Sequence, residues 1–232
     1  GVGGGGGGGG VGRRGLGANP GRGRGREGGL RRAVERRGPG VYYQPQGELT
    51  TSRIVGLEAL VRWDHPDRGL LAPGEFLDAA DQSGLIVELG RQVLTMGLAE
   101  LARWRFVPGY EDLELCVNVS AQELLHPDRF ALTTDLLRSH QLPPSALTIE
   151  VLESVLFDVE GVVQQALMSY VDAGIQLALD DFGTGSSSLV HLRHVPFTTL
   201  HTHRARVPWV RASLPHRATF RAPPSPPAPP PP

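Results

Sequence analysis

The strongest constraint on the fold is the alternation, between residues 41 and 200, of short apolar segments with longer segments of helical spacing. The strand-like segments are 41–45, 54–63, 113–119, 147–152, 175–179 and 197–200. Helices are expected over 30–37, 75–82, 85–104, 128–140, 161–173 and 186–192. Because strands and helices alternate with short connections, the sequence predicts a parallel α/β architecture. An open doubly wound sheet and a closed barrel both fit this pattern.

The second predicted strand, Ile54–Trp63, is apolar at consecutive positions. Continuous apolarity is typical of a strand that is buried on both faces. We therefore expect this strand to lie inside the domain, covered on either side.

Polar side chains interrupt the apolar strands near their carboxyl ends. Glu58 lies late in the second predicted strand, Asn118 late in the third and Glu150 late in the fourth. Asp180 and Asp181 end the fifth. A buried carboxylate is costly unless it is paired or bound to a metal. In a barrel these strand ends converge on one mouth, where active sites lie, so we expect the five side chains to share a site.

The chemistry of this set indicates a hard divalent cation. It consists of one amide and four carboxylates, without His or Cys, and oxygen ligands select Mg²⁺ or Mn²⁺ over Zn²⁺. The adjacent Asp180 and Asp181 suit two ions. Such a site fits in-line attack on a phosphodiester by a metal-activated water. A lone acid at a strand end is more often a helix cap or a solvated loop residue, so the prediction rests on the joint pattern.

The distribution of charge agrees with a cation site. Residues 41–200 hold nine arginines against 22 acids, for a net charge of −13, whereas 1–40 carry +7 and 201–232 carry +5. An acidic segment repels phosphates and nucleic acid unless cations intervene. The chain contains no lysine, which excludes every mechanism that uses one.

Composition also predicts the domain boundaries. Residues 1–29 are low-complexity Gly and Arg, for which we expect disorder rather than RNA binding. Residues 30–200 form the domain, and 201–232 form a basic Pro-rich tail that we also expect to be disordered. The one cysteine, Cys116, is expected to be a small core residue. No apolar run approaches the ~18 residues of a membrane helix and no signal core is visible, so a cytoplasmic protein is expected.

The segment Glu58-Ala59-Leu60-Val61-Arg62-Trp63 resembles the signature after which EAL domains are named. The resemblance continues in the family's order and spacing over about residues 30–200. It includes Tyr43-Gln44-Pro45, Val117-Asn118-Val119-Ser120, Ile149-Glu150-Val151-Leu152-Glu153-Ser154 and Asp180-Asp181-Phe182-Gly183-Thr184-Gly185. Three letters alone specify little, whereas five ordered motifs are specific.

This resemblance implies a modified (β/α)₈ barrel of the TIM type that hydrolyses cyclic-di-GMP to linear pGpG with Mg²⁺ or Mn²⁺. It implies that the metal ligands are Glu58, Asn118, Glu150 and Asp180. It also implies that Asp181 holds a second ion or the attacking water.

The resemblance implies roles for three further residues. Glu153 would brace the loop after the fifth strand, and Gln44 and Arg62 would contact the dinucleotide. The family also includes many homodimers.

The resemblance ends after Leu200. His201-Thr202-His203-Arg204 stands where the family has a motif whose lysine lies close to the attacking water, and the family's later Glu, Gln and last two strands have no counterpart. We therefore expect an incomplete barrel of about six of eight strands with open edges. Our hypothesis is a frameshift or a mis-joined reading near position 200.

Three functions stay open at this point. The first is a cyclic-di-GMP phosphodiesterase. The second is a degenerate EAL module that binds cyclic-di-GMP or a protein partner without cleavage, and the third is a fragment with neither activity.

Overall fold

The structure, a computed structural model, describes residues 20–47, 53–157, 161–180, 197, 199–200 and 220–221. Its α-helices are α1 (Pro20–Glu35), α2 (Leu77–Gln82), α3 (Leu85–Trp104), α4 (Ala121–Leu124), α5 (Arg129–Ser139) and α6 (Val162–Asp172). Its 3-10 helices are η1 (Pro73–Glu75), η2 (Pro144–Ala146) and η3 (Glu153–Phe157). Its strands are β1 (Pro39–Gly47), β2 (Ile54–His65), β3 (Gly69–Leu71), β4 (Glu114–Asn118), β5 (Leu147–Leu152), β6 (Gln176–Asp180), β7 (Thr199–Leu200) and β8 (Phe220–Arg221).

The strands form one sheet in the order β7-β6-β5-β4-β2-β1-β8, and β3 pairs with β2 off this path. The strands from β2 through β4, β5 and β6 to β7 are parallel neighbours. The predicted α/β fold is confirmed. The prediction of a parallel architecture throughout is wrong at β1, which pairs antiparallel with β2. The chain between these two strands is too short for the crossover that parallel neighbours require.

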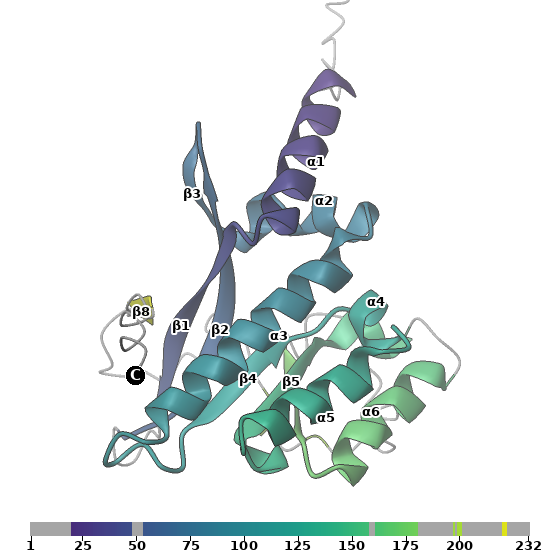
Figure 1. The fold of residues 1–232 in the computed structure, drawn as a ribbon. Coiled ribbons are helices and arrows are strands. Elements are labelled where there is room, and N and C mark those ends of the chain that lie inside the picture. Colours follow the sequence, from purple (N-terminus) through teal and green to yellow (C-terminus); the bar gives the residue numbers. More distant parts are fainter. Residues whose placement is uncertain are drawn as a thin grey trace, which may run out of the picture.

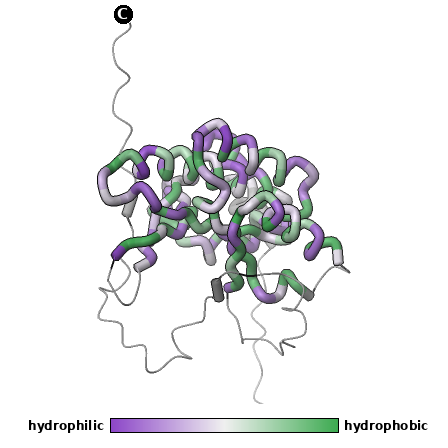
Figure 2. The backbone as a smooth tube through the Cα atoms, turned by 90° about the horizontal axis from the view of Figure 1, so that it is seen from below, coloured by the Kyte–Doolittle hydropathy of each residue, from purple (hydrophilic) through white to green (hydrophobic). Residues whose placement is uncertain are grey.

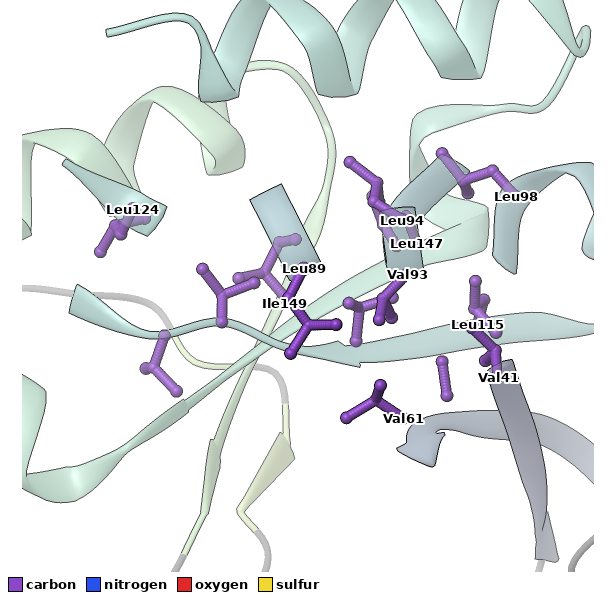
Figure 3. Close-up of a cluster of buried hydrophobic side chains, with 14 of the residues drawn as sticks. Val41, Val61, Leu89, Val93, Leu94, Leu98, Leu115, Leu124, Leu147 and Ile149 are labelled. Carbon is purple, nitrogen blue, oxygen red and sulfur yellow. The ribbon is translucent and has the colours of Figure 1, made fainter. Parts of the chain in front are cut away.

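Helices α3, α5 and α6 lie along one side of the sheet (Figure 1). Figure 3 shows the core between them and the strands, where side chains of α3 lie beside those of β4 and β5. Among the labelled residues of this core, the fully buried ones are Leu89, Leu94, Leu98, Leu115, Leu147 and Ile149. Because apolar area removed from water stabilises the fold by roughly 25 cal/mol per Å², this layer holds helices and sheet together.

The position of α3 over the sheet depends on a glycine. A Cβ at Gly97 would lie 2.8 Å from Cδ2 of Leu115 in β4, closer than carbon atoms pack. A larger residue at position 97 would therefore require the fully buried Leu115 side chain to shift. Gly84, with φ of 71°, precedes α3 in the left-handed region, where glycine carries no steric penalty.

Strand β2 has two different faces. Leu57, Ala59, Val61 and Trp63 are buried, whereas the residues between them are half-buried. The prediction that this strand is buried on both faces is therefore wrong. Successive side chains of a strand point to opposite faces, and the described helices cover one of them.

Several element boundaries differ from the predictions. Helix α1 begins at Pro20, before the expected start at residue 30, and the predicted helix over 186–192 lies outside the described residues. The short β3 and α4 were not predicted.

Figure 2 shows hydrophilic and hydrophobic residues interleaved along the chain. No helix in the described ranges is long and apolar enough to cross a membrane.

Candidate active site

The candidate site lies on the sheet face that is opposite the helices. Pairing between strands places Glu58 of β2 beside Cys116 of β4, and Asn118 of β4 beside Glu150 of β5. Gln44 of β1 pairs with Glu58. Because paired residues point to the same face and alternate residues share it, these side chains extend from one surface.

Side-chain hydrogen bonds between described residues connect neighbouring strands on this face. The Asn118 amide donates from Nδ2 to Oε1 of Glu58 over 2.9 Å, which joins β4 to β2. The Cys116 thiol donates to Oε2 of Glu150 over 3.0 Å, which joins β4 to β5. Glu150 is only 2% exposed, so the thiol gives a buried carboxylate oxygen a partner.

The Cys116 thiol is influenced by three carboxylates from neighbouring strands. Burial raises its pKa well above the usual value, and the carboxylates of Glu150, Glu58 and Asp180 raise it further. Three predicted metal ligands from three strands therefore act on one sulfur atom. The thiol is a hydrogen-bond donor to the Glu150 carboxylate here.

This role of Cys116 was not predicted, since the residue was expected to be a small core residue. Its burial is confirmed, but it lies on the polar face and not with the apolar neighbours Leu115 and Val117. The two-residue period leading to Asn118 carries this information. A period of two places Cys116 and Asn118 on the same face.

The prediction that Glu58 lies late in its strand is wrong. Strand β2 continues to His65 and pairs with β1 and β3 beyond the site. Glu58 is nevertheless level with Cys116, because β4 begins beside Gly56. Asn118 and Asp180 are the last residues of β4 and β6, as expected.

The donor chemistry of these residues fits a hard cation. Three carboxylates and one amide supply oxygen, and the one nearby sulfur retains its proton. Within the part of the chain that is described, no group of three or more His, Cys, Asp or Glu side chains lies close enough to form a metal site. Asp181, the other predicted ligand, lies outside the described residues. The complete ligand set therefore stays a prediction.

The three residues with other predicted roles occupy different places. Arg62 lies on the same face of β2 as Glu58, with its guanidinium 6.0 Å from the centre of the Tyr42 ring. Gln44 lies beside Glu58 on β1. Glu153 begins η3 and is 5% exposed, and the loop that it is predicted to brace lies outside the described residues.

A second polar cluster lies among the helices and was not predicted. Glu123 of α4 and Arg129 of α5 form a buried ion pair, with 3.3 Å between Oε1 of Glu123 and Nη2 of Arg129. The sequence did contain part of the signal. Ser120 and Glu123 have the spacing of a capping box at a helix start, and both halves of that box form.

An α/β protein with carboxylate and amide side chains on neighbouring parallel strands is the class that this fold and candidate site define. A family model described as EAL domain matches residues 27–222, beyond Leu200, where the motif resemblance ends. The bifunctional diguanylate cyclase/cyclic di-GMP phosphodiesterase MucR of Pseudomonas aeruginosa is 37% identical over 178 residues, covering 75% of this chain and 25% of that protein. The chain belongs to the EAL domain family.

Solved structures agree with this assignment. The PaMucR phosphodiesterase in complex with c-di-GMP superposes with a TM-score of 0.73 at 36% identity, covering 78% of this chain and 72% of that one. The EAL enzyme Bd1971, bound to cAMP and cyclic-di-GMP, gives 0.74 at 26% identity, covering 82% and 52%. The predicted EAL-type fold is thereby confirmed. The chain spans about a quarter of the length of the curated relative that it matches.

Proposed function

We propose that this chain is a metal-dependent phosphodiesterase that hydrolyses cyclic-di-GMP to linear pGpG. The observation that carries the proposal is the Asn118–Glu58 hydrogen bond across β4 and β2, with Glu150 paired beside Asn118. Three predicted ligands thus come from three adjacent strands onto one face. The similarity to a phosphodiesterase and to a complex with c-di-GMP supports the substrate.

The proposed cofactor is a pair of Mg²⁺ or Mn²⁺ ions, which would supply an activated water and charge stabilisation at the phosphodiester. The residues proposed to hold them are Glu58, Asn118, Glu150, Asp180 and Asp181. Asn118 donates from its nitrogen to Glu58, which leaves its oxygen as the acceptor atom that suits a cation. The Cys116 thiol orients the Glu150 carboxylate.

Substrate contacts are assigned to β1 and β2, and Glu153 is proposed to brace the loop after β6. Gln44 lies beside Glu58, and Arg62 extends from the same face further along β2. A guanidinium matches the geometry of a phosphate, and the acidic centre of the domain offers the substrate few other cations.

A second candidate function is a binding module that retains cyclic-di-GMP without cleaving it. The observation that favours it is His201-Thr202-His203-Arg204, which stands where related domains have a lysine, in a chain without any lysine. Neither histidine nor arginine reproduces the compact ammonium group of a lysine beside the attacking water.

One assay distinguishes the two functions. The purified chain is incubated with cyclic-di-GMP and Mn²⁺, and both ligand binding and pGpG formation are followed. Formation of pGpG supports the phosphodiesterase, binding alone supports the module, and the absence of both contradicts each.

The variant Glu58→Ala is expected to abolish whichever signal appears. Glu114→Gln, at the start of β4, is the matched control, because it removes a carboxylate from the same face at the other end of the strand. An unchanged signal in Glu58→Ala would show that the site is assigned to the wrong residues.

A further inference from the structure

The buried ion pair between α4 and α5 lies outside the candidate site and is costly to maintain. The side chains of Glu123 and Arg129 are 4% and 3% exposed. Arg129 lies close to Glu123 and Tyr170, but none of its three guanidinium nitrogens forms a well-aligned hydrogen bond within the described part of the chain. Because removing two charges from water often costs more than their attraction returns, stability alone is a weak explanation for the pair.

The Glu123 carboxylate holds the turn that follows β4. Its Oε2 accepts hydrogen bonds from the backbone N of Ser120 over 3.0 Å and from the Ser120 hydroxyl over 2.9 Å. The backbone N of Val119, between Ser120 and Asn118, donates to the carbonyl of Glu150 over 2.8 Å. The two residues after Asn118 are therefore fixed from two directions, by β5 and by Glu123.

The carboxylate itself is confined on its other sides. A Cβ added at Gly90 of α3 would overlap Oε1 of Glu123, so α3 leaves room for the carboxylate only because residue 90 is glycine. Next to Glu123, the Gln122 amide donates to the carbonyl of Asp81 over 2.9 Å, which ties α4 to the end of α2. Arg129 closes the remaining side.

We propose that Glu123 is a positioning residue for Asn118, which it holds in place through Ser120 so that the amide lies against Glu58. The ion pair with Arg129 and the space at Gly90 fix the carboxylate for this purpose. This inference deepens the proposed function, because it concerns the same site, and its test includes a measurement that needs no cation.

The sequence allows Asn118 to be observed directly. The chain contains only two asparagines, Asn19 and Asn118, so selective ¹⁵N-asparagine labelling yields two side-chain amide signals, which Asn118→Asp assigns. In the metal-free wild-type chain we expect the Asn118 signal to report its hydrogen bond to Glu58. Glu123→Ala should move that signal towards the position of an unstructured asparagine and accelerate its hydrogen exchange by about fivefold.

Glu123→Gln is the conservative variant. Its amide oxygen still accepts from Ser120, since Gln also serves at this position of a capping box, so the Asn118 signal should stay near its wild-type position. Gly90→Ala is the second variant, because it displaces the carboxylate without removing it. It should shift the Asn118 signal as Glu123→Ala does, which keeps the test decisive if Glu123→Ala fails to fold.

Leu101→Ala controls for general destabilisation, since Leu101 is fully buried towards the opposite end of α3. It should lower the melting temperature and leave the Asn118 signal in place. A wild-type Asn118 signal in folded Glu123→Ala or Gly90→Ala, or a loss of the signal in Leu101→Ala, would overturn the inference.

Calorimetric titration with Mn²⁺ alone gives the second measurement. Glu123→Ala should weaken Mn²⁺ binding by about 10- to 100-fold, because loss of a residue that orients a metal ligand typically reduces metal affinity by this factor. Glu123→Gln should restore most of the Mn²⁺ affinity. Equal Mn²⁺ affinity in the wild type and Glu123→Ala would contradict the inference. If wild-type protein binds no Mn²⁺, the proposed metal site fails, and the amide signal still decides the role of Glu123.

Discussion

The two faces of the sheet are made by the same strands but have opposite chemistry. On the face towards the helices, Leu115, Leu147 and Ile149 are buried beside side chains of α3. On the other face, Cys116 and Glu150 form a hydrogen bond among carboxylates. Alternate residues of one strand therefore supply the apolar core on one face and the polar side chains on the other. Glu123 is a buried polar residue of α4, and its carboxylate accepts hydrogen bonds from Ser120, two residues after Asn118.

The largest effect is expected on the helix side, for Arg129→Met. The substitution leaves Glu123 buried without its cation, and we expect the free energy of unfolding to fall by about 3–5 kcal/mol at neutral pH. Urea denaturation followed by circular dichroism measures this change. The double variant Arg129→Met/Glu123→Gln should recover much of it, because no buried charge remains. A double variant that is less stable than Arg129→Met would contradict this explanation.

The same variant should depend on pH in a defined direction. Burial raises the pKa of the Glu123 carboxyl, and Arg129 opposes that rise. Because the folded pKa lies above the unfolded one, the stabilising contribution of the protonated group is complete at low pH and is lost as the pH rises through the folded pKa. The loss in Arg129→Met should therefore become smaller as the pH falls below neutral, as unfolding at a series of pH values would show. A loss that grows towards low pH would contradict it.

A comparable effect is expected for Leu115→Ala in the apolar layer. Leu115 is fully buried and contacts α3 where Gly97 permits close approach. Removing its side chain should cost about 2–5 kcal/mol, since a cavity remains. Chemical denaturation measures the loss, and titration of the folded variant should give wild-type Mn²⁺ affinity. Reduced Mn²⁺ affinity in folded Leu115→Ala would contradict the claim that the apolar face contributes to stability and not to cation binding.

On the polar face, Glu150→Gln should have the opposite profile. Its side chain can still accept from Cys116, so stability should change little, while Mn²⁺ affinity should fall at least about tenfold with the loss of a charged ligand. Calorimetric titration measures the affinity, with Glu114→Gln as the control for removal of one charge from the same face. Equal losses of affinity in both variants would indicate a general charge effect and not a ligand.

The smallest effect is expected at Ser120→Ala, at the border between the two regions. Loss of the N-cap hydroxyl should reduce stability by about 0.5–2 kcal/mol. The backbone N of Ser120 still donates to Glu123, so the Asn118 amide signal should move less than it does in Glu123→Ala. A larger shift in Ser120→Ala would place the holding contact in the hydroxyl and not in the backbone.

Local patterns were sufficient for much of the fold. Helical spacing after Gly84 predicted α3 at its observed bounds. The short apolar segment 147–152 predicted β5 at its observed bounds. The antiparallel β1 was missed, because the direction of a strand depends on its partner and on the length of the connection. The second covered face of β2 was predicted wrongly, because apolar composition does not reveal which faces have a covering layer.

The sequence by itself determined the EAL family and the order of the longer strands and helices, and it proposed the oxygen residues of the candidate site, since these follow from residue types at fixed spacing. Only the tertiary structure decided that Asn118 binds Glu58, that Cys116 donates to Glu150, and that Arg129 lies against Glu123. Each of these contacts joins residues on different elements. Strand pairing brings β2, β4 and β5 together, and the packing of the helices brings α4 and α5 together. No local pattern encodes the resulting distances.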